Sequence, residues 1–327
     1  MSRLESFKDN IFLVDNSNFE DSALKLFRFQ AKYNKIYRNY INMINVDPDT
    51  VRQLGDIPFL PIELFKSREI KTGKWKHETI FESSGTTGMK TSKHFIEDLN
   101  FYQSVATAGF KHFYGELNDY VFLALLPSYL ERENSSLVVM MEHFISSSMY
   151  CESGFYLDNP KDLINCIESL GKDRKVLLIG VTFALLDLAE RENLDLKGVI
   201  LMETGGMKGR REEMIREEIH QVFQQQFNVK NVHSEYGMTE LMSQAYASSK
   251  GHFRCPPWMK IMIRDIYDPQ RIQINGSGGI NVIDLANIHS CAFIETQDIG
   301  KNVKNRGFEV LGRVDNSDVR GCNLLVI

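Results

Sequence analysis

Short apolar runs alternate with helical patterns through the middle of this 327-residue chain. Residues 120–126, 176–179 and 199–202 are apolar and of strand length, and residues 183–190 between the last two follow a helical pattern. Strands joined through helices pair in parallel, because the helix carries the chain back across the sheet. We therefore predict an α/β fold with a doubly wound parallel sheet.

The two ends of the chain have different patterns. The first 75 residues read as mainly helical, and the segment 57–61 (IPFLP) carries two prolines that stop a helix. After about residue 265, short strand-like runs are separated by turn residues. We predict a helical segment packed on the core at 1–75, an α/β core that binds ATP and the acyl group at 76–265, and a small β-rich part with a C-terminal acceptor tail at 266–327.

Composition excludes several classes of protein. The net charge is −5 and no basic stripe is present, which argues against nucleic acid as a partner. The apolar runs are too short to span a bilayer and residues 1–10 lack a signal-peptide core, so we expect a cytoplasmic protein without a transmembrane segment. The five cysteines are dispersed, which indicates a reducing compartment and neither a disulfide framework nor structural zinc. They are Cys151, Cys166, Cys255, Cys291 and Cys322.

A run of small hydroxyl and glycine residues ending in a lysine follows the apolar residues 79–81. It consists of Ser83, Ser84, Gly85, Thr86, Thr87, Gly88, Met89 and Lys90. Such a loop can turn backbone N–H groups and hydroxyls toward phosphates. It is not a Walker A loop, because only two residues separate Gly85 from Gly88. The spacing also fits an ordinary glycine turn.

The second notable segment is Tyr236-Gly237-Met238-Thr239-Glu240. The tyrosine ring could stack on a base, the threonine hydroxyl could bind a phosphate, and the carboxylate is a hard oxygen ligand suited to Mg²⁺. Taken alone, the segment also fits an ordinary loop with a buried tyrosine.

Two further segments follow toward the C-terminus. In the run at 295–300 (ETQDIG), Asp298 could accept hydrogen bonds from the two hydroxyls of a ribose, although aspartate is also common in plain turns. In the run at 312–315 (GRVD), Arg313 could reach a ribose or a phosphate, and it could equally be a surface arginine. The four segments together, in this order, indicate an enzyme that spends ATP to activate a carboxylic acid.

These four segments resemble the successive signatures of the adenylate-forming superfamily, which includes acyl-CoA synthetases, peptide synthetase adenylation domains and luciferase. Gly205 and Gly206 resemble the glycine pair that this superfamily places against the adenine and the acyl group. The entry at 57–61, the segment at 126–137 and the ending of the chain resemble the LuxE-type acyl-protein synthetases (long-chain-fatty-acid–luciferin-component ligases), with phenylacetate-CoA ligases as the next relatives. The resemblance extends from about residue 55 to the C-terminus.

The resemblance implies a fold, cofactors and site residues. The fold is the large N-terminal domain of the adenylate-forming enzymes without the usual mobile C-terminal domain, and the cofactors are ATP and Mg²⁺. Glu240 is the implied magnesium ligand, and the implied catalytic residues are Lys90, Thr239, Glu240 and Cys322. The implied ATP- or AMP-binding residues are Ser83, Ser84, Gly85, Thr86, Thr87, Gly88, Lys90, Gly205, Gly206, Tyr236, Gly237, Thr239, Asp298 and Arg313.

Cys322 lies five residues from the end of the chain (327 − 322), after a glycine. Taken alone it fits a buried or merely terminal cysteine, although Arg320 is close enough in sequence to favour a thiolate. The acyl-protein synthetases accept the acyl group on a cysteine near the C-terminus. The resemblance therefore implies that a small-molecule carboxylic acid, expected to be fatty, becomes a thioester on Cys322 and passes to a partner such as an acyl reductase.

The sequence is also compatible with three other functions. The acceptor could be free coenzyme A, as in an acyl-CoA ligase. A separate protein could supply the missing C-terminal domain in trans. The chain could also be a nucleotide-binding module without catalytic activity.

Overall fold

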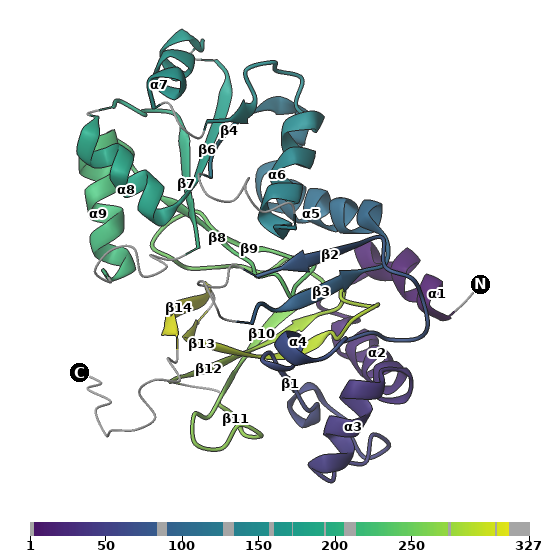
Figure 1. Ribbon diagram of the computed structural model, residues 1–327. Helices are drawn as coiled ribbons and strands as arrows, with labels where there is room; N and C mark the ends of the chain where they lie inside the picture. Colours follow the sequence, from purple (N-terminus) through teal and green to yellow (C-terminus); the bar gives the residue numbers. More distant parts are fainter. Residues whose placement is uncertain are drawn as a thin grey trace.

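The structure is a computed structural model of the 327-residue chain (Figure 1). It describes residues 3–83, 90–126, 134–156, 160–171, 173–192, 194–205, 214–273, 276–304 and 306–313. No helix in these ranges has the length and apolar character needed to cross a bilayer.

A six-stranded sheet with the order β5-β4-β6-β7-β8-β9 confirms the predicted α/β fold. All its neighbouring strands pair in parallel except β8 and β9, which are antiparallel. The strands are β4 (Tyr120–Leu125), β5 (Gly154–Phe155), β6 (Lys175–Val181), β7 (Ile200–Thr204), β8 (His233–Tyr236) and β9 (Ala245–Ala247). Every residue of β4 is buried, which explains its continuous apolar sequence, since a parallel strand is covered on both faces.

Helices cover both faces of this sheet. In Figure 1, α5 and α6 lie on one side of it and α8 and α9 on the other. The helices are α5 (Leu99–Tyr114), α6 (Ser136–Ser147), α7 (Pro160–Ser169), α8 (Thr182–Arg191) and α9 (Arg216–Phe227), and a 3-10 turn at Leu117–Asp119 precedes β4. Asp98 and Ser135 begin α5 and α6, because their side-chain oxygens accept from backbone N–H groups of the first turn.

A second sheet has the order β1-β13-β12-β10-β11, and β14 pairs with β13. Its pairs are antiparallel apart from β1 with β13. The strands are β1 (Leu60–Pro61), β10 (Met259–Arg264), β11 (Ile272–Gln273), β12 (Ser277–Asp284), β13 (Phe293–Val303) and β14 (Gly307–Arg313). The sheet therefore takes two of its strands from before residue 265.

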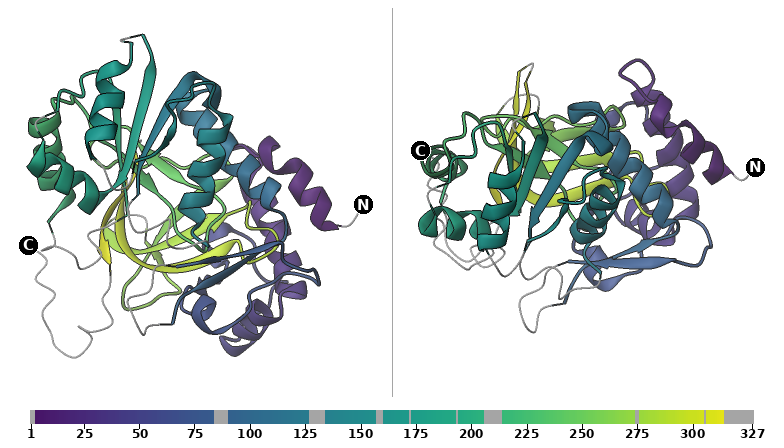
Figure 2. Two further views of the ribbon diagram at one scale, coloured as in Figure 1. Left: turned by 45° about the horizontal axis from the view of Figure 1, so that its top comes forward. Right: turned by 90° about the horizontal axis from the view of Figure 1, so that it is seen from above.

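The remaining elements are a hairpin and the N-terminal helices. The hairpin joins β2 (Thr79–Glu82) to β3 (Lys93–Ile96), and the glycine loop connects its two strands. The helices are α1 (Arg3–Asn10), α2 (Phe19–Tyr33), α3 (Lys35–Met43) and α4 (Leu64–Ser67), with 3-10 turns at Ile11–Leu13 and Leu54–Asp56. In Figure 2 the N-terminal helices lie at the end of the molecule away from α8 and α9.

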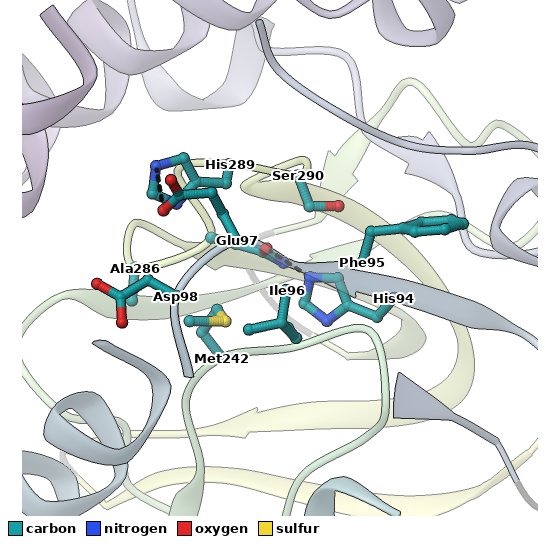
Figure 3. Close-up of a pocket in the computed structure, with 10 residues that line it drawn as sticks. His94, Phe95, Ile96, Glu97, Asp98, Met242, Ala286, His289 and Ser290 are labelled. Atoms are coloured by element: carbon teal, nitrogen blue, oxygen red, sulfur yellow. Dashed lines mark hydrogen bonds and ion pairs between the residues drawn. The ribbon is translucent and has the colours of Figure 1, made fainter. Parts of the chain in front are cut away.

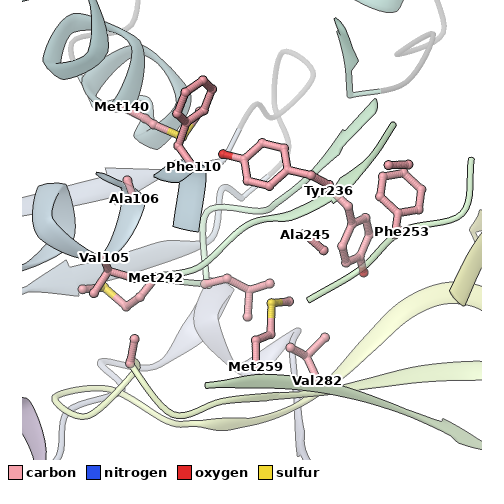
Figure 4. Packing of buried hydrophobic residues seen from close by; sticks show 14 of the residues in the cluster. Val105, Ala106, Phe110, Met140, Tyr236, Met242, Ala245, Phe253, Met259 and Val282 are labelled. Atoms are coloured by element: carbon pink, nitrogen blue, oxygen red, sulfur yellow. The ribbon is translucent and has the colours of Figure 1, made fainter. Parts of the chain in front are cut away.

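Buried side chains join the two sheets into one core. The cluster in Figure 4 combines Phe110 of α5 and Met140 of α6 with Tyr236 of β8, Met259 of β10 and Val282 of β12. Each of these residues is at most 8% exposed. Removing one of the large side chains would cost about 3–5 kcal/mol of stability. The packing of these side chains therefore holds β8 and β12 in a fixed relation.

Candidate functional site

The residues that flank the glycine loop, Ser83 and Ser92, are hydrogen-bonded to each other at the end of the hairpin. The N–H of Ser83 donates to the carbonyl of Ser92 (3.1 Å), and the N–H of Ser92 donates to the hydroxyl of Ser83 (2.9 Å). Lys90 is exposed near the end of the loop. Ser84, Gly85, Thr86, Thr87 and Gly88 lie outside the described residues, so their phosphate contacts stay predictions.

Glu240 lies where the loop returns to the hairpin. It occupies a turn just after β8, it is only 5% exposed, and the Ser92 hydroxyl hydrogen-bonds its carboxyl group. Burial raises the pKa of Glu240, and the Ser92 hydrogen bond and the charge of Arg313 only partly oppose that effect. Its negative charge is therefore poorly compensated by the protein.

Three of the predicted residues lie together, joined by one hydrogen bond and one ion pair. The Tyr236 hydroxyl donates to Oδ2 of Asp298 at 2.8 Å. Asp298 on β13 is the cross-strand partner of Arg313 on β14, and the Arg313 Nε lies 4.0 Å from Asp298 Oδ1. Burial raises the pKa of Asp298, while the Tyr236 hydrogen bond and Arg313 oppose the rise. The Asp298 side chain keeps 18% of its surface exposed, which leaves room for a further hydrogen-bond donor.

The surroundings of Tyr236 were not foreseen from the sequence. Its ring is 8% exposed and packs against Phe253 and Phe308, with ring centroids 5.8 and 5.6 Å away. The ring thus forms part of the wall behind Asp298. Its predicted stacking on adenine stays a prediction.

The ends of β7 and β8 carry a second polar group. The Thr204 hydroxyl donates to Glu235, and a Cβ atom on Gly237 would lie only 2.4 Å from Glu235 Oε1. Desolvation raises the pKa of Glu235, which is 8% exposed, to about 7. Gly205 follows β7 with φ +70°, a conformation suited to glycine, and its neighbour Gly206 lies outside the described residues. Ligands of open α/β sheets bind at these carboxyl ends of the strands.

Residues outside the predicted motifs hold the Thr239–Glu240 turn. The His94 Nδ1–H donates to the Thr239 carbonyl at 2.8 Å, and the Asn287 amide donates to the Glu240 carbonyl at 2.7 Å. Asp284 accepts from the N–H groups of Met242 and Ser243 at 2.8 and 2.9 Å. Sequence reasoning missed these three side chains because no motif contains them. Figure 3 shows His94 beside a cavity of about 10 Å³, roughly the space of one water molecule.

The acidic side chains at this site suit a magnesium ion that is bound together with a nucleotide. Among the described residues no three His, Cys, Asp or Glu side chains gather to form a metal site on their own. Mg²⁺ bound with phosphates needs only one or two protein carboxylates, and it keeps phosphate and water oxygens as its other ligands. Glu240 meets that need, because its buried charge lacks a full partner.

Cys322 lies outside the described residues. The four described cysteines are all free thiols, and only Cys151 is exposed. Desolvation raises the pKa of both Cys255 and Cys291 to about 12, so neither forms a thiolate at neutral pH.

The solved structures that resemble this one include several ligases. A 2-hydroxyisobutyryl-CoA ligase in complex with 2-HIB-AMP and CoA is 12% identical with a TM-score of 0.65, and the match covers 90% of this chain and 69% of that chain. ATP-bound MatB from Rhodopseudomonas palustris is 15% identical with a TM-score of 0.51, covering 72% and 47%. The O-succinylbenzoate coenzyme A synthetase MenE from Bacillus subtilis, in complex with AMP, is 19% identical with a TM-score of 0.51, covering 74% and 50%.

These similarities show that the chain shares the fold of these ligases. The match spans about half the length of MatB and MenE. The profile of the acyl-protein synthetase family, LuxE, matches residues 14–327, so the chain belongs to that family. No curated protein sequence matches the chain.

Proposed function

We propose that this protein uses ATP to activate a carboxylic acid as an acyl-adenylate and then transfers the acyl group to Cys322. The observation that carries the first step is the contact of Tyr236, Asp298 and Arg313, three residues from separate predicted motifs. Glu240 at the ends of the glycine loop adds a buried carboxylate to the same site. The family and the fold support the same chemistry.

In the first step, a carboxylate oxygen of the acid attacks the α-phosphorus of ATP, and the bond to pyrophosphate breaks. The protein contributes position and charge rather than covalent chemistry. In this proposal Lys90 and the loop hydroxyls bind the β and γ phosphates, and Thr239 binds the α-phosphate. A magnesium ion held by Glu240 and the phosphates would neutralise charge on the phosphate oxygens.

The nucleoside is held on the opposite side of this site. Asp298 uses one carboxylate oxygen for Tyr236, and its remaining lone pairs can accept from the ribose hydroxyls. Arg313, 63% exposed, sets the charge beside that carboxylate and can reach the ribose or a phosphate. Tyr236 and the Gly205–Gly206 pair are proposed to enclose the adenine.

In the second step, the Cys322 thiolate attacks the acyl carbonyl carbon. The carbon–oxygen bond to AMP breaks, AMP leaves with the bonding electrons, and a thioester forms. The substrate is proposed to be a fatty acid, the cell compartment the cytoplasm, and the next acceptor a partner such as an acyl reductase. Coenzyme A is a second candidate acceptor, because the solved 2-hydroxyisobutyryl-CoA ligase holds it together with an acyl-adenylate.

The test is pyrophosphate release with ATP, Mg²⁺ and a series of carboxylic acids, followed by intact-protein mass. We expect acid-dependent release and a hydroxylamine-sensitive acyl adduct that Cys322→Ala abolishes. Cys151→Ala, which changes an exposed cysteine, is the matched control and should keep the adduct. Acylation that survives Cys322→Ala would contradict the proposed acceptor, and CoA-dependent AMP release by that variant would favour coenzyme A.

A further inference from the structure

Two buried side chains bridge the main-chain carbonyls of Thr239 and Glu240. His94 donates to the first carbonyl at 2.8 Å, and Asn287 donates to the second at 2.7 Å. The two side chains also touch each other, with His94 Nε2 3.1 Å from Asn287 Oδ1. Each is only 1% exposed. The bridge therefore fixes both residues of the turn from behind.

Both members of the bridge are themselves anchored. His94 lies on β3, two residues beyond Ser92. Ser92 pairs with Ser83 where the glycine loop leaves and rejoins the hairpin, and its hydroxyl hydrogen-bonds Glu240. Asn287 lies between β12 and β13, and its carbonyl accepts from the Gln30 side chain of α2 at 3.0 Å. Phe65 packs edge-on against the His94 ring. The turn is thus tied to the loop on one side and to the second sheet on the other.

We propose that His94 and Asn287 are positioning residues that set the Thr239–Glu240 turn for the phosphates and the metal ion of bound ATP. This inference rests on the proposed function. The bridge holds the backbone of the turn and leaves the Thr239 and Glu240 side chains free to act. A misplacement of about 1 Å in such a site can cost about a hundredfold in rate, so a rigid support behind the turn is needed.

Two conservative variants each remove one of the two contacts that His94 makes. His94→Asn keeps a donor close to the position of Nδ1 and loses the contact with Asn287. His94→Gln reaches toward Asn287 and loses the Thr239 carbonyl. Because Thr239 would lose its support in His94→Gln and the adjoining Glu240 would shift with it, we expect this variant to weaken binding of Mg·ATP by about tenfold or more, and His94→Asn to weaken it less.

The measurement is calorimetric titration of the full chain with ATP, once with Mg²⁺ and once with EDTA. We expect His94→Gln to lose affinity for ATP under both conditions and to lose more with Mg²⁺ than with EDTA, so that the ratio of the two affinities falls severalfold. A purely structural role would lower thermal stability without changing this ratio. His233→Gln is the control for the same substitution at a half-buried histidine, because the His233 ring pairs with the Tyr114 hydroxyl (3.1 Å) and not with the turn.

Each outcome decides the inference. An unchanged ratio in both folded His94 variants would overturn it, and Asn287→Ser provides the same test if His94→Gln does not fold. A wild-type protein that binds Mg·ATP but releases no pyrophosphate with any acid would refute the proposed reaction, while a reduced ratio in His94→Gln would still support the bridge. Absence of ATP binding by the wild-type protein would refute both.

Discussion

Replacing Glu235 with glutamine should stabilise the protein in a pH-dependent way. Glu235 is 8% exposed and its pKa rises from 4.5 to about 7 on folding, because burial disfavours the charged form. The folded state therefore binds the proton more tightly than the unfolded state. The stability contributed by the neutral carboxyl is complete below pH 4.5 and is lost as pH rises toward 7.

The magnitude follows from the difference of 7 − 4.5 pKa units. At about 1.36 kcal/mol per unit, the buried charge costs about 3 kcal/mol above pH 7, and about 2.5 kcal/mol of that cost appears between pH 5 and pH 8. Glu235→Gln keeps the size of the side chain and can still accept from the Thr204 hydroxyl, but it stays neutral. The variant should therefore gain stability over the wild type as pH rises.

The assay is urea unfolding of the wild type and of Glu235→Gln at pH 5 and pH 8. The difference between their free energies of unfolding should grow by about 2.5 kcal/mol in favour of the variant over this interval. Glu142→Gln, at an exposed position on α6, is the matched control and should show no such growth. A difference that stays the same at both pH values would refute the reasoning from burial.

Two further changes test the site and its support. Asp298→Asn keeps the hydrogen bond from Tyr236 but removes the charge beside Arg313. The dissociation constant of ATP, measured by calorimetry, should therefore rise about tenfold. An unchanged constant would contradict the proposed contact of Asp298 with the ribose. Gly307→Ala should destabilise the protein by about 2 kcal/mol or more in thermal unfolding, because φ is +102° and the new Cβ would lie 1.8 Å from the Phe253 carbonyl oxygen. Gly73→Ala is its control, with φ +86° but no atom nearer than 3.5 Å, and an equal loss in both variants would contradict the steric explanation.

The fold could be predicted from the sequence because its parallel strands are buried on both faces. The predicted strand at 120–126 corresponds to β4 (Tyr120–Leu125), and the predicted helix at 183–190 falls within α8 (Thr182–Arg191). Continuous apolar runs separated by helical patterns leave few other arrangements. The prediction of the adenylate-forming fold is confirmed by the structural neighbours.

The site could be predicted only in part. Motif residues such as Asp298 and Glu240 stand out because their chemistry suits a ribose or a cation, and the structure places them near Arg313 and Ser92. The hydrogen bond between Tyr236 and Asp298 joins residues 62 positions apart, so it follows from how the two sheets pack and not from any local pattern. His94 and Asn287 were missed for the same reason, since each acts through a main-chain carbonyl distant in sequence.

The most direct test of the central claim is carboxylic-acid-dependent exchange of labelled pyrophosphate into ATP. This exchange requires reversible formation of an acyl-adenylate, and it does not depend on Cys322 or on any partner. We predict exchange with at least one class of carboxylic acid, retained in Cys322→Ala and strongly reduced in Asp298→Asn. Tight binding of ATP without exchange across a broad series of acids would contradict the account and would identify the protein as a nucleotide-binding module.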